Sequence, residues 1–143
     1  MWHCSNKDNI YTDDGSFPAP NDMAWLDPIG TLLFVAGCTE NIRLGTTVLI
    51  LPYRLPVVTA KQLATLDVVS NGRLILGVGV GWMHEEAAVL GMPFDNRGKR
   101  SNEQLDIFRS LFTEDEPHYG GEFYELPEVR FEPKPIQDPV PVW

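Results

Sequence analysis

The sequence is poor in cysteine and in basic residues, and it contains no long apolar run. Its two cysteines, Cys4 and Cys38, form neither a disulfide framework nor a zinc pattern, which favours a reduced cytoplasmic chain. Eleven basic residues against twenty acidic ones give a net charge of −9, so the basic footprint of nucleic-acid-binding proteins is missing. The longest apolar run, around residues 32–36, is far shorter than the ~20 residues of a membrane span. We therefore expect a cytoplasmic protein that binds neither nucleic acid nor membranes.

The 143 residues, 43% of them hydrophobic, suit one globular domain. Residues 1–26 are rich in turn-forming residues and are expected to be loop. Residues 27–113 alternate helical and strand patterns. In residues 114–143, Gly120-Gly121 suggests a hairpin or an extended excursion, and prolines then precede the expected start of another strand. This division predicts a single domain with a central block of strand-helix units.

The central block reads as helix, strand, helix, strand, helix. Asp27 can cap a helix that Pro28 begins, and the apolar composition of residues 29–39 predicts that this helix is buried on most sides. Residues 42–51 and 73–80 are short and β-branched, as in parallel strands covered on both faces. Further helices are expected from Pro56 to Gly72, over residues 85–90 and over residues 98–112. Such alternation implies an α/β fold with a parallel sheet.

Two complete strands do not make a stable parallel sheet, because each needs a neighbour on both edges. The number of elements therefore suggests that the 143 residues are part of a larger sheet. Open strand edges also predict self-association.

The sharpest local feature is the series Gly77, Gly79 and Gly81 at the end of a strand. Glycines there let backbone amides approach a ligand closely, and a following helix favours anions. A dinucleotide fingerprint needs glycine at position 82, where Trp82 stands, so a Rossmann site is disfavoured. Close packing of the strand on its neighbours explains the glycines equally well, and the pattern alone leaves both readings open.

Other polar clusters carry weaker signals. Arg97, Lys99 and Arg100 read as a solvated helix start, with an anion-binding site as the alternative. His84 stands beside two acidic residues but matches no metal pattern, so no metal is expected. No serine elbow or other nucleophile with a neighbouring base is recognisable.

Several consecutive blocks of the sequence resemble luciferase-like monooxygenases, in the order of that family. These blocks are Trp25-Leu26-Asp27-Pro28, then residues 42–49, 56–62, 65–67 and 72–74, then residues 77–82 with Glu85-Glu86, and then residues 121–124 and 133–135. Residues 11–18 resemble the branch of probable coenzyme F-420-dependent oxidoreductases. The resemblance covers nearly residues 11 to 143.

The resemblance implies a (β/α)8 TIM barrel, with the site at the C-terminal ends of the strands. On that template the chain is a fragment of the barrel: it supplies the second helix, the third and fourth strand-helix units, and the insertion before the fifth strand.

The resemblance also implies two contacts with a cofactor ring. One is a cis peptide bond between Thr47 and Val48, behind the ring, and the other is the turn after the fourth strand. The implied cofactor-binding residues are Thr47, Val48, Ile50, Val80, Gly81, Trp82 and Glu85. No catalytic residue is implied.

In this family the cofactor carries the chemistry. The expected activity is hydride transfer between coenzyme F-420 and a small organic substrate. FMN-dependent monooxygenation is the first alternative, and a truncated, non-catalytic fragment is the second. Family members are often homodimers.

Overall fold

The computed structural model describes residues 12–13, 16, 19–20 and 22–143. In chain order the elements are α1 (Pro28–Cys38), β1 (Leu44–Gly45), β2 (Leu49–Ile50), the 3-10 helix η1 (Leu51–Tyr53), α2 (Pro56–Val69), β3 (Leu74–Ile75), β4 (Val78–Gly79), α3 (His84–Val89), α4 (Arg97–Thr113), β5 (Tyr119–Gly120) and β6 (Glu125–Leu126). The predicted loop over residues 1–26 lies partly outside the described residues, and its described part contains neither helix nor strand.

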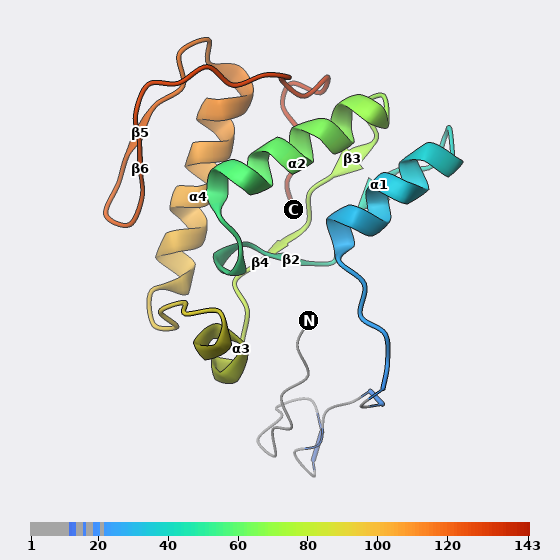
Figure 1. Ribbon diagram of the computed structural model, residues 1–143, viewed down its shortest axis with the longest axis vertical. Helices are drawn as coiled ribbons and strands as arrows, with labels where there is room; N and C mark the ends of the chain where they lie inside the picture. The colour runs from blue at the N-terminus through green and yellow to red at the C-terminus, as the bar shows by residue number, and fades with distance from the viewer. Residues whose placement is uncertain (1–11, 14–15, 17–18, 21) are drawn as a thin grey trace.

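The strands run parallel in the central sheet, as the α/β prediction requires. β1 pairs with β3, β2 pairs with β4, and Leu76 forms a parallel bridge with Val142. The amide of Trp143 donates to the carbonyl of Leu76 at 2.9 Å, which confirms the start of a further strand at the end of the sequence. The chain therefore contributes three neighbouring parallel segments, and residues 73–80 form the middle one (Figure 1).

The predicted strand over residues 42–51 is interrupted, and this is a correction. The amide of Thr46 donates to the carbonyl of Ile75, and the amide of Leu49 donates to the carbonyl of Gly77. Three residue steps on the first strand therefore lie opposite two steps on its neighbour. This is the register of a β-bulge. The Thr46 hydroxyl fills the gap by donating to the Gly77 carbonyl at 2.7 Å. The expected cis peptide bond between Thr47 and Val48 is present in this bulge.

The predicted strand over residues 73–80 is likewise divided, into β3 and β4. Leu76, between the two, turns its backbone to the opposite neighbour and pairs with the C-terminal segment.

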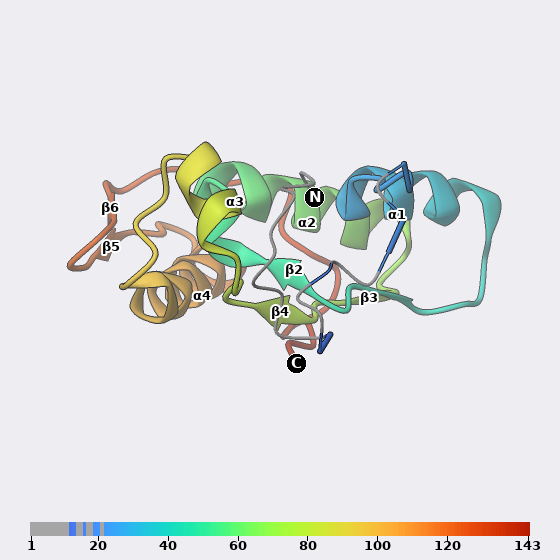
Figure 2. The ribbon, with the colours of Figure 1, turned by 90° about the horizontal axis from the view of Figure 1, so that it is seen from below.

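Helices α1 and α2 lie on the same side of the strands, and α2 packs against both α1 and α4 (Figures 1 and 2). The core between these helices and the strands is mainly aliphatic, with Phe108 and Phe131 among its buried residues. Its most completely buried side chains include Leu44, Leu49, Leu51, Leu63, Leu66, Leu74, Leu76, Ile107 and Leu111. This layer of side chains covers the face of the sheet on which α1 and α2 lie.

Helix α1 begins as predicted, because the carboxylate of Asp27 accepts the amide of Gly30 at 2.8 Å and Pro28 occupies the first turn. The expectation that α1 is buried on most sides is wrong. Only Ile29 and Ala36 are buried, and Phe34 is 73% exposed. The reason is that α1 packs against α2 and β1 along one side, while the opposite side faces solvent.

Two buried charged residues join the helices to the sheet. Asp67 of α2 is fully buried and accepts the backbone amides of Ile136 and Gln137 at 2.7 and 3.0 Å. Arg73, before β3, donates to the carbonyl of Ala36 at 3.0 Å and to the hydroxyl of Thr39 at 2.9 Å. The first residue anchors the C-terminal segment, and the second anchors the end of α1.

The predicted hairpin is confirmed as the antiparallel pair β5–β6. The carboxylate of Glu103 on α4 accepts the amides of Glu122, Phe123 and Tyr124, at distances from 2.8 to 3.3 Å. The hairpin is thereby fastened to α4. In the described part of the chain, no helix has the length and apolar character needed to cross a membrane.

Candidate functional site

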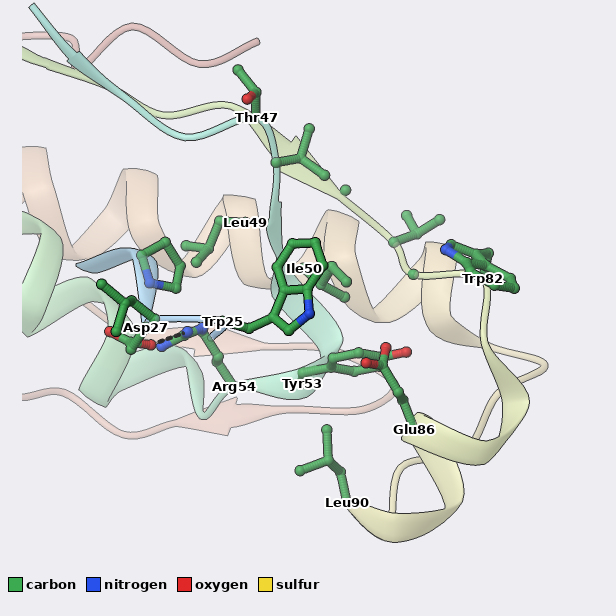
Figure 3. Close-up of a pocket in the computed structure, with 16 residues that line it drawn as sticks. Trp25, Asp27, Thr47, Leu49, Ile50, Tyr53, Arg54, Trp82, Glu86 and Leu90 are labelled. Carbon is green, nitrogen blue, oxygen red and sulfur yellow. Dashed lines mark hydrogen bonds and ion pairs between the residues drawn. The ribbon is translucent and has the colours of Figure 1, made fainter. Parts of the chain in front are cut away.

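A cavity of about 970 Å³ opens at the C-terminal ends of β2 and β4 (Figure 3). The residues that line it come from the segment before α1, from the bulge and β2, from η1, from the turn after β4, and from α3. They are Trp25, Leu26, Asp27, Pro28, Thr47, Val48, Leu49, Ile50, Tyr53, Arg54, Gly79, Val80, Gly81, Trp82, Glu86 and Leu90. Catalytic sites of α/β folds lie at this end of parallel strands.

Six of the seven residues expected to bind a cofactor line this cavity. They are Thr47, Val48, Ile50, Val80, Gly81 and Trp82. The seventh, Glu85, lies on the exposed side of α3 and is not among the lining residues, whereas Glu86 is. The structure thus brings the six residues together, and their role in binding a cofactor stays a prediction.

The strand glycines have two different surroundings. A Cβ atom at Gly77 would stand 1.9 Å from the carbonyl oxygen of Thr46, and one at Gly79 would stand 2.5 Å from a methyl of Val48. These two glycines let the bulged strand approach closely, which supports the packing reading of the pattern. Gly81 differs because its φ of 79° is a left-handed conformation that favours glycine. Its turn faces the cavity.

Tyr53 and Glu86 meet in the wall of the cavity, and sequence reasoning missed both (Figure 3). Burial, together with the nearby charge of Glu86 and a hydrogen bond to its carboxylate, raises the pKa of Tyr53 to about 12. Tyr53 therefore stays protonated at ordinary pH and acts as a donor. Glu86 is only 3% exposed. The signal that could have found it is helical phase, because Glu85 and Glu86 share the first turn of α3 but point in different directions.

Asp27 and Arg54 form an ion pair at the rim of the cavity (Figure 3). Burial alone would raise the pKa of Asp27. The hydrogen bond and charge of Arg54, with the amide of Gly30, outweigh that effect and lower the pKa below its ordinary 3.8. Of the lining residues in the described part of the chain, Arg54 is the only cation, and it is thus already paired.

The expectation that Arg97 is part of a solvated helix start is wrong. Its guanidinium lies 3.8 Å from the centre of the Phe94 ring and donates through Nε to the carbonyl of Gly81 at 3.1 Å. Lys99 is exposed, as expected. Among the described residues, no group of three or more histidine, cysteine, aspartate or glutamate side chains could hold a metal ion.

Parallel strands that alternate with outer helices, with a cavity at the C-terminal strand ends, are the arrangement of part of a (β/α)8 barrel. Comparison with known proteins agrees with this class. The model of the luciferase-like monooxygenase family matches residues 8–143. The chain belongs to that family.

The relatives differ in the cofactor that their names state. The chain is 35% identical to the F-420-dependent glucose-6-phosphate dehydrogenase of Amycolatopsis mediterranei, over 95% of this chain and 42% of that protein. It is 32% identical to the oxygenase component of the flavin-dependent trigonelline monooxygenase of Acinetobacter baylyi, over 90% of this chain and 36% of that protein. The chain spans less than half the length of these curated relatives.

Among solved structures, the crystal structure of the monooxygenase RslO1 from Streptomyces bottropensis superposes with a TM-score of 0.77 at 29% identity. The similarity covers 81% of this chain and 36% of that one. The fold, including its restriction to part of the barrel, is therefore as the sequence predicts.

Proposed function

We propose that the protein is an oxidoreductase that transfers hydride between coenzyme F-420 and a small organic substrate. The observation that carries the proposal is the gathering of six expected ring-contacting residues around one cavity at the strand ends. The 35% identity with an F-420-dependent dehydrogenase supports the choice of cofactor. The two cysteines, of which Cys38 is a free thiol, support a reducing, cytoplasmic location.

The residues present fit the ring of such a cofactor. The cavity has the size of a small-molecule site, and its wall at Val48, Ile50 and Val80 is aliphatic. Val48 is 55% and Val80 is 41% exposed, so both offer apolar surface that a flat ring can cover. Arg54 is engaged by Asp27, and among the described residues no other cation lines the cavity. We therefore assign the ring to this wall and do not assign the phosphate-bearing end of the cofactor to it.

Bound F-420 supplies the centre that accepts or donates hydride. The chain's own residues hold and shield that centre. Val48 and Val80 exclude water from one face, and the backbone of Gly81 can approach closely because it has no side chain. Tyr53 holds its proton and donates to the carbonyl of Met83 at 3.4 Å, beside the buried carboxylate of Glu86 in the wall of the cavity.

An FMN-dependent monooxygenase is the second candidate. The flavin-dependent relative and the structural similarity to a monooxygenase favour it. Deazaflavin and flavin rings have the same flat shape, so the apolar wall suits either of them.

The test is a binding titration of the purified protein with F-420 and, separately, with FMN. Val48→Glu should weaken F-420 binding at least about tenfold, because it buries a charge against the ring. Val69→Glu is the control, since Val69 is also 55% exposed but does not line the cavity. Binding of FMN alone would replace the proposal with the monooxygenase. Binding of neither would overturn both and leave the non-catalytic alternative.

A further inference from the structure

The turn from Val80 to Trp82 is held by neighbours on more than one side. A Cβ atom at Gly81 would lie 3.0 Å from the hydroxyl of Tyr53 and 3.1 Å from a methyl of Ile50, so the turn rests directly on η1 and β2. The carbonyl of Gly81 accepts a hydrogen bond from Arg97 at the start of α4. The position of this wall of the cavity therefore depends on a residue that does not line the cavity.

Arg97 is itself fixed by its surroundings. Its Nη1 donates to the carbonyl of Phe94 at 3.1 Å, and its guanidinium lies over the Phe94 ring. The Phe94 ring in turn stacks on His84 of α3, with 3.5 Å between the ring centres. A planar guanidinium can lie flat on a ring while its edge donates in a fixed direction, a geometry that the compact ammonium of lysine does not reproduce. Arg97 thus connects α3, the turn and α4.

We propose that Arg97 is a positioning residue for the proposed cofactor site. It holds the Gly81 carbonyl away from the cavity and so keeps the turn from Val80 to Trp82 in the conformation that faces the ring. The inference rests on the proposed function. It adds a residue outside the cavity whose hydrogen bond sets the affinity of the site.

Arg100 provides a matched comparison one turn further along α4. It is also half-buried, donates to the side chain of Asn96 at 2.8 Å, and lies 4.6 Å from the centre of the Phe123 ring. Among the described residues it contacts Asn96, Phe123 and Tyr124 rather than the turn after β4. Substitutions at Arg97 and Arg100 therefore remove similar stacking and charge, but only one of them releases Gly81.

The experiment compares Arg97→Met and Arg97→Lys with Arg100→Met and Arg100→Lys in two measurements. The first is the dissociation constant for F-420 and for FMN, which should rise about tenfold in Arg97→Met, the value of one hydrogen bond from a charged donor. Arg97→Lys should restore part of the affinity, and both Arg100 variants should bind like the wild type.

The second measurement needs no cofactor. The protein is labelled with 5-fluorotryptophan, and the fluorine resonance of Trp82, one of four tryptophans, is assigned with Trp82→Phe. The resonance should move or broaden in Arg97→Met and stay in place in Arg100→Met.

The outcomes separate the two proposals. An unmoved Trp82 resonance in Arg97→Met would overturn the positioning role, whatever binds. A moved resonance with unchanged affinity for a cofactor that the wild type binds would overturn it too. If the wild type binds neither cofactor, the proposed function fails, and the positioning role for a cofactor site fails with it, even if the resonance moves.

Discussion

Gly77 and Gly37 have opposite surroundings, and the contrast shows what a missing Cβ does in this fold. Gly77 faces the backbone of Thr46 on the neighbouring strand, where an added Cβ would stand 1.9 Å from an oxygen. Gly37 lies in α1 with nothing within 4 Å of an added Cβ. One glycine permits the strands to approach each other, and the other only lowers the stability of its helix.

We predict opposite effects of alanine at these two positions. Gly77→Ala should lower the free energy of unfolding by about 3 kcal/mol or more, because neither backbone can give way without separating the strands. Gly37→Ala should raise it by up to about 1 kcal/mol through helix propensity. Urea denaturation of both variants measures the difference. A Gly77→Ala protein as stable as the wild type would contradict the close approach seen here.

Asp27 is predicted to act both as a helix cap and as an ion-pair partner. Asp27→Ala removes both roles and should cost about 1 kcal/mol. Asp27→Asn keeps an oxygen for the Gly30 amide, loses the charge toward Arg54, and should cost a few tenths of a kcal/mol.

The pKa of Asp27 is lowered in the folded state, so its charge stabilises the fold above the ordinary value of 3.8. This contribution is lost as the pH falls through the lowered pKa. The stability difference between wild type and Asp27→Asn should therefore shrink from pH 7 to about pH 2 in thermal unfolding. A difference that grows on acidification would contradict the assignment.

At the scale of single residues, the sequence predicted much of the cavity lining, but it did not predict the buried pair of Tyr53 and Glu86. The blocks around Thr47 and Gly81 carried a family resemblance, and six of the residues they pointed to line the cavity. Tyr53 has no local pattern, and the helical phase that separates Glu86 from Glu85 does not show which residue Glu86 meets. Their meeting depends on how η1 and α3 pack, which spacing along the chain does not encode.

At the scale of elements, helix ends were predictable and strand continuity was not. Asp27-Pro28 marks a helix start through local backbone chemistry, and the start lies where expected. The helix expected from Pro56 to Gly72 ends at Val69, and Gly72 shortly after it has the left-handed φ of 74° that follows many helix ends. Residues 42–51 carry a uniform strand composition, yet a bulge divides them, because the register is set by the partner strand. The exposure of α1 was missed for a related reason: apolar composition does not say which neighbours are present.

Asp67 provides the test of how elements are joined. Asp67→Asn keeps the volume but replaces one of two acceptor oxygens with a donor. One oxygen of Asp67 accepts the amides of Ile136 and Gln137 and the other accepts Nε2 of the Gln137 side chain at 2.7 Å, so the new donor meets another donor in either orientation. We predict a loss of about 2–4 kcal/mol in the free energy of unfolding. Asp106→Asn is the control, because Asp106 forms only an exposed pair with Arg109, and it should change stability by less than about 0.5 kcal/mol. Equal stabilities for the two variants in urea denaturation would refute the anchoring role.

At the scale of the whole molecule, the described strands form a sheet with an open edge. β1 and β2 pair with β3 and β4 on one side, and no other described strand lies on their outer side. An unpaired parallel edge is a template for association. The expected dimer can therefore form through this edge as well as through helices, and the two routes respond differently to substitution.

We predict that the chain self-associates in sedimentation equilibrium at micromolar concentration. Gly45→Lys should weaken the association, because a lysine on an edge strand disfavours further pairing. Gly45 suits this change because an added Cβ there would make only ordinary contacts, at 3.6 Å or more. A wild-type chain that stays monomeric at the highest accessible concentration would exclude association through this edge. Unchanged association in Gly45→Lys would assign it to another surface.

The two faces of the cavity wall tolerate substitution to different degrees. The glycines behind it allow almost no change, since any side chain at Gly77 or Gly79 meets the neighbouring strand. Val48 and Val80, which stand in front, are about half exposed and take no part in the buried core. Substitutions at the front can therefore alter the shape and polarity of the cavity at little cost in folding. The cavity wall thus combines a fixed backbone with side chains that can be replaced. Such a wall lets a barrel acquire new substrates while its fold stays the same.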